Sequence, residues 1–135
     1  MRTYKPAHIV SFANNASAEL YVYSIVSLST GIVALGSDDS IRLFSHDSLR
    51  PISKLPSPRT KSPYSQVLKP VDESTVATAS ADGVVRFWDT RANTLTHEYR
   101  VESTTPVRCL EVDKPHNRFA AGAEVDGSEA RLHIW

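Results

Sequence analysis

The stretch TVATASADGVVRFWDTR, residues Thr75 to Arg91, decides the fold of this chain. It begins with small and β-branched residues, as is typical of a strand. Ala81-Asp82-Gly83 follows and forms a turn, because Asp bonds its own backbone two residues on and Gly tolerates a positive φ. A second β-prone segment then runs to Trp88-Asp89. The pattern predicts a hairpin, which must belong to a larger sheet because an isolated hairpin is only marginally stable in water.

The same design occurs twice more in the chain. GIVALGSDDSIRLFS at Gly31 to Ser45 and FAAGAEVDGSEARLHIW at Phe119 to Trp135 each join an apolar strand, an acidic turn and a second β-prone segment. When Phe44, Trp88 and Trp135 are taken as equivalent, the copies are spaced 44 and 47 residues apart. A period in the forties with β signals and a Trp-Asp ending is typical of β-propeller blades.

On these residues the chain resembles the WD-repeat β-propeller family. The dipeptide that ends the family's repeat is present as Trp88-Asp89, and Phe44-Ser45 takes its place in the first copy. The third copy, with its acidic insertion between two strands, is similar to the corresponding blade of the WD repeat-containing protein 89 group. The resemblance implies an all-β chain of four-stranded antiparallel blades that form an incomplete propeller.

Turn signals divide the chain into three expected blades within a single WD-repeat region, at residues 21–55, 64–101 and 106–135. The expected strands are 21–28, 31–36, 40–45 and 49–55, then 66–69, 75–80, 84–89 and 95–101, then 106–112, 119–123 and 130–135. The proline and serine stretch at 56–66 cannot continue a sheet and is expected to link two blades. The family resemblance implies that residues 7–12 serve as an outer closing strand.

Three blades cannot close a propeller, which needs roughly four to eight. We therefore expect the chain to be a piece of a longer propeller. Two alternatives stay open. Two or more copies can associate through their open blade edges, or the N-terminal strand can complete blade three and leave an open arc.

The composition excludes several classes of protein. Fifteen basic and fifteen acidic residues cancel, which argues against direct binding of nucleic acid. Cys109 is the sole cysteine, so the chain has neither a disulfide framework nor a cysteine zinc site. The N-terminus lacks the apolar region of a signal peptide, and no run approaches the roughly 18 apolar residues of a membrane span. We expect a soluble protein of the cytoplasm, the nucleus or both.

The strongest functional candidate is Trp88-Asp89-Thr90-Arg91. This tetrapeptide resembles the motif by which some WD-repeat proteins dock on the damaged-DNA-binding adaptor of cullin ubiquitin ligases. Asp89 and Arg91 are expected to pair and to present a guanidinium on one rim, which is a good interfacial anchor. In the alternative interpretation Trp88 is buried between strands, Asp89 satisfies a turn and Arg91 is solvated.

Three residues match a hydrogen-bonded network that, in the family, ties each blade together. These are Thr78, Asp82 and Trp88, while the fourth member, a His before the first strand, is absent. The network is therefore expected to be incomplete and structural, because a buried Trp N–H needs a partner. Trp135 is the corresponding structural residue of the third copy. We expect the blades to be held mainly by apolar packing.

Propellers bind through the loops on their rims. The candidate protein-binding residues are Asp38, Asp39, Asp82, Asp89, Arg91, Glu124 and Asp126. The acidic loop that contains Glu124 and Asp126 suits a basic peptide, and no second ligand cluster supports a metal ion. Ser57-Pro58 and Ser62-Pro63 lie beside basic residues and are either phosphorylation sites or parts of a solvated loop.

No pattern of residues indicates catalysis or a cofactor. The five His residues are scattered, and the sequence has no phosphate-binding Gly-rich loop and no nucleophile elbow. The prediction is a non-catalytic scaffold that binds other proteins. The alternatives are a substrate receptor of a cullin ligase and, with less support, a propeller enzyme whose titratable groups converge on the channel.

Overall fold

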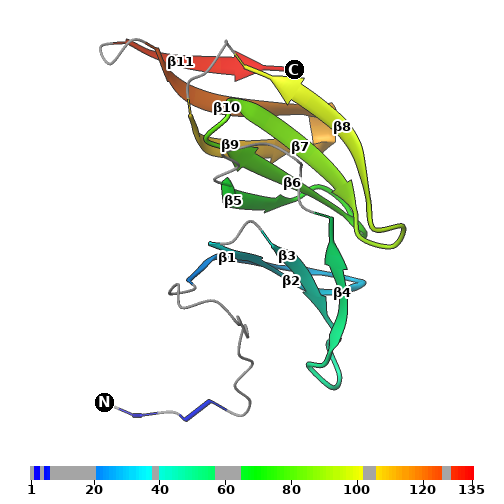
Figure 1. Cartoon of the computed structure of the whole chain (residues 1–135). Coiled ribbons are helices and arrows are strands. Elements are labelled where there is room, and N and C mark those ends of the chain that lie inside the picture. Colours follow the sequence, from blue (N-terminus) through cyan, green and yellow to red (C-terminus); the bar gives the residue numbers. More distant parts are fainter. Residues whose placement is uncertain are drawn as a thin grey trace.

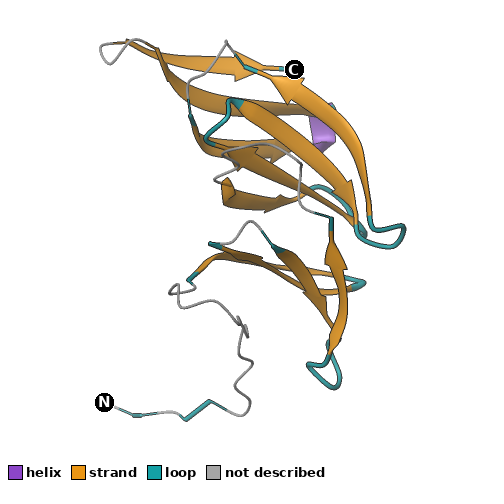
Figure 2. Cartoon of the chain, in the orientation of Figure 1, coloured by secondary structure: helices purple, strands orange, loops and turns teal. Residues whose placement is uncertain are grey.

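The computed structural model describes residues 2–3, 5–6, 21–37, 40–56, 65–101, 106–125 and 129–135. In this part of the chain eleven strands form three antiparallel sheets, and no α-helix is present (Figures 1 and 2). The predicted all-β fold of propeller-type blades is confirmed. The expected closing strand at 7–12 and both serine-proline sites lie outside the described residues.

Each sheet is one blade, with its strands in sequence order. Blade one contains β1 (Val22–Leu28), β2 (Gly31–Gly36), β3 (Ile41–Phe44) and β4 (Pro51–Leu55). Blade two contains β5 (Ser65–Pro70), β6 (Thr75–Ser80), β7 (Val84–Asp89) and β8 (Thr94–Arg100). Blade three contains β9 (Val107–Asp113), β10 (Arg118–Val125) and β11 (Glu129–Ile134), with the short 3-10 helix η1 (Lys114–His116) between β9 and β10.

The observed strands follow the expected ones closely, with one informative difference. A strand was expected from residue 49, but β4 begins at Pro51. Leu49 has a φ of 52°, outside the β region. Its N–H donates to the carbonyl of Ser45, so the chain is still turning at this point. The turn between β3 and β4 is therefore longer than the sequence pattern indicated.

The three blades stack face to face, with blade two in the middle (Figure 1). One apolar core lies between blades one and two and is formed by Leu28, Val33, Leu35, Ile41, Leu43, Leu55, Leu68, Val76 and Trp88. A second core lies between blades two and three and is formed by Ala77, Ala79, Val85, Val101, Val107, Leu110, Phe119, Ala121 and Ala123. Apolar packing thus joins neighbouring blades, as expected from the sequence.

Each middle strand of blade two is buried almost throughout. In β6 and β7 only the ends and Phe87 retain some exposure, whereas most of the outer strand β8 is exposed. This gradient is typical of a sheet that is covered on both faces. Among the described residues no helix is long and apolar enough to cross a membrane.

Candidate functional site

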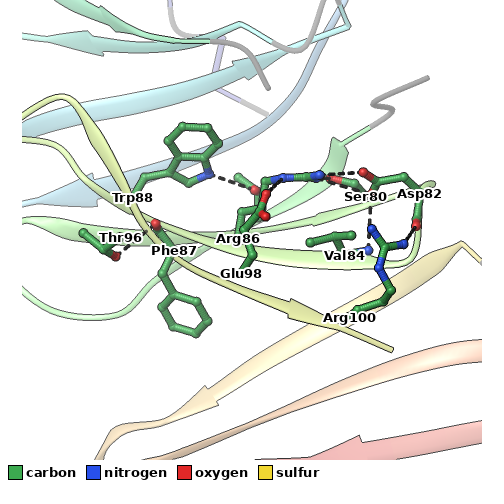
Figure 3. A network of polar contacts seen from close by, with 10 residues as sticks. Ser80, Asp82, Val84, Arg86, Phe87, Trp88, Thr96, Glu98 and Arg100 are labelled. Atoms are coloured by element: carbon green, nitrogen blue, oxygen red, sulfur yellow. Dashed lines mark hydrogen bonds and ion pairs between the residues drawn. The ribbon is translucent and has the colours of Figure 1, made fainter. Parts of the chain in front are cut away.

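A buried arginine organises the polar interior of blade two (Figure 3). Arg86 on β7 is 2% exposed, and its Nη2 donates to Oδ2 of Asp82 over 2.6 Å. Its Nε donates to Oε1 of Glu98 on β8 over 2.8 Å, and its Nη1 donates to Oγ of Ser80 over 3.2 Å. Burial alone would lower the pKa of Arg86, but the hydrogen bonds and charges of Asp82 and Glu98 outweigh burial and raise it.

The indole of Trp88 has its own partner beside this cluster. Its Nε1 donates to Oγ1 of Thr78 over 3.0 Å, and both residues are buried. Asp82 accepts from the Val84 N–H and pairs with Arg86. The three residues therefore serve two separate contacts, Trp88 with Thr78 and Asp82 with Arg86.

The end of β7 is fixed by a side chain that caps a turn. Oδ1 of Asp89 accepts from the backbone N–H groups of Arg91, over 2.8 Å, and Ala92, over 3.1 Å. The side chain of Arg91 is exposed. The ion pair expected between Asp89 and Arg91 is not observed in the described part of the chain, because the Asp89 carboxylate holds the turn instead.

Blades one and two are also joined by hydroxyl groups on the rim that carries Arg91. Oγ of Ser29 and Oγ1 of Thr30 both donate to the carbonyl of Glu73. Oγ1 of Thr90 lies 3.3 Å from Oγ1 of Thr30, and within blade two Thr90 donates through its N–H and its Oγ1 to the carbonyl of Ser74. The β1–β2, β5–β6 and β7–β8 turns therefore form one continuous rim. Arg91 is exposed in the β7–β8 turn of this rim, and its backbone N–H is bonded to Asp89.

A groove opens on the same rim between blades two and three. This rim groove has a volume of about 310 Å³. It is lined by Val71, Asp72, Phe87, Tyr99, Val112, Lys114, Asn117, Arg118, Phe119 and Trp135. Its lining therefore combines side chains of two blades with the β5–β6 turn and η1.

Aromatic rings form the wall of the rim groove. Phe119 and Trp135 stack with their ring centroids 4.7 Å apart and 13° between their planes. Phe87 and Tyr99 meet Phe119 edge to face, with centroids 5.0 Å and 4.9 Å away. Such geometries add to the stability of the apolar contact itself and hold the rings in place. The wall is thus a preformed apolar surface.

Charged groups border the rim groove. Oδ1 of Asp72 accepts from the N–H groups of Ser74 and Thr75, and these bonds, first that of Ser74, lower the pKa of Asp72. Nε of Arg118 donates to Asp113 over 2.7 Å, and His116 contacts the same carboxylate at 2.9 Å. His116 first and Arg118 second lower the pKa of Asp113.

The described site residues that the sequence predicted lie near the ends of strands, on opposite rims of the sheets. Asp82, in the β6–β7 turn, and Arg91, after β7, lie at opposite ends of the same strand. Glu124 lies on β10, next to the β10–β11 turn. Asp38, Asp39 and Asp126 lie outside the described residues. Asp82 is held in its pair with Arg86, and its side chain is 16% exposed.

Sequence reasoning missed the rim groove. Its aromatic residues were visible in the sequence, but the groove depends on how two blades meet across the stack.

Among the described residues, no three His, Cys, Asp or Glu side chains gather closely enough to hold a metal ion.

Stacked antiparallel sheets of three or four strands, one of which ends in Trp88-Asp89, are typical of propeller blades, and comparison with known proteins agrees. Residues 57–89 match the family model described as "WD domain, G-beta repeat". The "Uncharacterized WD repeat-containing protein C63.06" of Schizosaccharomyces pombe is 28% identical over 119 residues, which cover 87% of this chain and 35% of that protein. These two matches support the WD-repeat family for this chain.

The fold has a solved counterpart. The crystal structure of the computationally designed Ika8 protein matches with a TM-score of 0.65 and 18% identity, over 84% of this chain and 32% of the Ika8 chain. At this identity the likeness concerns the fold alone. The chain spans about a third of the length of the curated relative that it matches.

Proposed function

We propose that this chain is a non-catalytic protein-interaction scaffold built from WD repeats. The observation that carries the proposal is the rim groove, where a preformed aromatic wall is bordered by charged side chains. Interfaces of this kind receive an apolar or aromatic anchor from a partner and place polar contacts around it. The match to WD repeats, which generally mediate contacts between proteins, supports this role.

The proposed partners are other proteins, among them further copies of this chain that meet at its open blades. We place the protein in the cytoplasm, the nucleus or both. The acidic insertion between β10 and β11 supports the narrower proposal that the chain belongs with the WD repeat-containing protein 89 group.

Peptides displayed as a random library on phage offer a direct test of the rim groove. Selected peptides are expected to carry an aromatic or large aliphatic residue and to change the fluorescence of Trp135, which lines the groove. Lys114→Glu and Trp135→Ala should each weaken binding at least tenfold. Lys54→Glu, the same charge reversal at an exposed residue of β4, serves as the matched control.

The scaffold proposal fails if the library yields no binder. It also fails if the selected peptides bind the Lys114→Glu and Trp135→Ala variants as tightly as they bind the wild-type chain. Circular dichroism spectra of the variants establish that a loss of binding does not come from unfolding.

A second candidate function is that of a substrate receptor of a cullin ligase, docking through Trp88-Asp89-Thr90-Arg91. The observation in its favour is that Arg91 is exposed on a turn whose backbone Asp89 fixes. Arg91→Ala should abolish binding of the purified damaged-DNA-binding adaptor and leave the sheet intact. Asp89→Ala should do the same by releasing the turn.

Arg100→Ala, at an exposed arginine near the other end of blade two, is the control for this second test. Adaptor captured equally by the wild-type chain and by both rim variants would exclude the receptor role. The scaffold proposal would stand, because the rim groove does not include Arg91.

A further inference from the structure

The strand registers establish which residues of the three blades are equivalent. In each blade one residue of the second strand faces an aromatic residue at the end of the third strand. The pairs are Ile32 with Phe44, Val76 with Trp88 and Phe119 with Trp135. Because side chains alternate between the faces of a sheet, every neighbouring position can be matched from these pairs.

One face of each blade points toward the blade that follows it along the stack. The third strand contributes two apolar residues to this face, one and three positions before the aromatic residue of the pair. These residues are Leu43 and Ile41 in blade one, Phe87 and Val85 in blade two, and Ile134 and Leu132 in blade three. We call this the leading face.

The leading faces of blades one and two are covered, and that of blade three is open. Leu43 is 5% exposed and Val85 is 0% exposed, because blades two and three cover them. At the equivalent positions of blade three, Ile134 is 61% exposed and Leu132 is 67% exposed. Leu132 and Ile134 thus stay exposed where the equivalent residues Val85 and Leu43 are buried.

The opposite, trailing face shows the same relationship at the other end of the stack. Leu68 on β5 and Leu110 on β9 hold equivalent register positions, opposite Thr78 and Ala121, and are 2% and 4% exposed. Each is buried against the preceding blade. The equivalent residue of blade one is Ile25 on β1, which is 63% exposed.

At both interfaces within the chain a leading face packs on a trailing face. The exposed leading face of blade three and the exposed trailing face of blade one are therefore complementary. We propose that the leading face of blade three in one copy packs on the trailing face of blade one in a second copy. Leu132 and Ile134 then take the environments of Val85 and Phe87, and Ile25 takes that of Leu68. Figure 1 places β1 and β11 at opposite ends of the stack.

This contact is head to tail, because both interfaces within the chain join a leading face to a trailing face. An arrangement of this kind closes into a ring if the rotation between copies allows it and otherwise continues as an open chain. The inference deepens the proposed contact between copies and does not involve the rim groove.

Complementary variants test the direction of the contact as well as its existence. Light scattering at several concentrations should give the wild-type chain a mass of at least two copies. Leu132→Glu/Ile134→Glu, with a blocked leading face, and Ile25→Glu, with a blocked trailing face, should each be monomeric. An equimolar mixture of these variants should form a one-to-one dimer, since each retains the face that the other lacks.

Leu95→Glu, at an exposed apolar residue of the outer strand β8, is the matched control and should associate as the wild-type chain does. If a glutamate variant does not fold, the milder Leu132→Ser/Ile134→Ser and Ile25→Ser variants replace it. A monomeric wild-type chain overturns the inference, as does a mixture that stays monomeric. Neither outcome affects peptide binding at the rim groove, so the two proposals fail independently.

Discussion

Nη2 of Arg86 lies 2.6 Å from Oδ2 of Asp82, so a turn residue neutralises a cation that is almost entirely buried in the next strand. Glu98 supplies the second carboxylate from β8, but its side chain is half exposed. A buried charge that loses its partner keeps its desolvation cost without the compensating attraction. The β6–β7 turn therefore contributes to the stability of blade two through its side chain as well as its backbone.

Asp82→Ala should lower the free energy of unfolding by about 3 kcal/mol, because it leaves the buried Arg86 guanidinium with a single charged partner, the half-exposed Glu98. Glu98→Gln should have a smaller effect, since water can replace part of that contact. Urea denaturation of the wild-type chain and both variants gives the comparison. Adding Arg86→Met to Asp82→Ala should recover much of the loss. An Asp82→Ala variant as stable as Glu98→Gln would contradict this account.

Thr78→Val should lower the free energy of unfolding by about 1–3 kcal/mol, because the buried Trp88 N–H loses its acceptor while the volume of the side chain is kept. Combining it with Trp88→Phe isolates the hydrogen bond. Thr78→Val should lower the free energy of unfolding less in the Trp88→Phe background than in the wild-type chain. Additive losses in this double-mutant cycle would show that the 3.0 Å contact contributes nothing.

Blade two shows which contacts of Arg86 can be predicted from the sequence and which cannot. Alternation along β7 places Arg86 on the same face as Trp88, yet a charged residue on a buried face is acceptable only with partners. Asp82 is four residues away and could be anticipated. Glu98 comes from β8, and the register that places it opposite Arg86 depends on an irregularity between Phe87 and Trp88. Such an irregularity has no signal in the sequence.

The rim groove was beyond prediction for a related reason. Strand periodicity predicts that Phe119 and Trp135 share a face, and they do stack. Their contact with Phe87 and Tyr99 depends on the distance and angle between two blades. Small residues such as Ala121 lie in the core between these two sheets, alongside larger ones such as Leu110. The repeat spacing of the sequence therefore predicts the blades, but it does not predict the shape of a groove between two of them.

Acid should destabilise the folded chain. The pKa values of Asp72, Glu111, Asp113 and Glu129 are all lowered by hydrogen bonds that each carboxylate accepts. The unfolded chain then binds more protons than the folded chain in the acid range, so stability is complete above the unfolded pKa values and is lost as the pH falls through the folded ones. Urea midpoints measured between pH 6 and pH 3 should therefore decrease toward acid.

Asp72→Asn gives this pH dependence a local test. The amide oxygen can still accept from the N–H groups of Ser74 and Thr75, so the turn is kept while the titrating charge is removed. The variant should lose less stability than the wild-type chain between pH 5 and pH 3. Equal losses in the two proteins would show that Asp72 does not contribute to the acid sensitivity.

Gly31 is the position where blade one should tolerate substitution least. Its φ is 150°, and a Cβ atom placed there would lie 2.4 Å from the backbone carbonyl oxygen of Phe44. That oxygen belongs to the neighbouring strand β3 and cannot move without breaking the register of the sheet. Gly31→Ala should therefore lower the free energy of unfolding by well over ~1 kcal/mol, because the positive φ and the steric clash with the Phe44 carbonyl both act against alanine.

Ser29→Ala, two residues earlier, is the comparison for Gly31→Ala. It removes one exposed hydrogen bond to the carbonyl of Glu73 and should lower the free energy of unfolding by about 1 kcal/mol or less. Thermal and urea unfolding of both variants measures the difference. If Gly31→Ala proved as mild as Ser29→Ala, the approach of β2 to β3 would have to be looser than the structure shows.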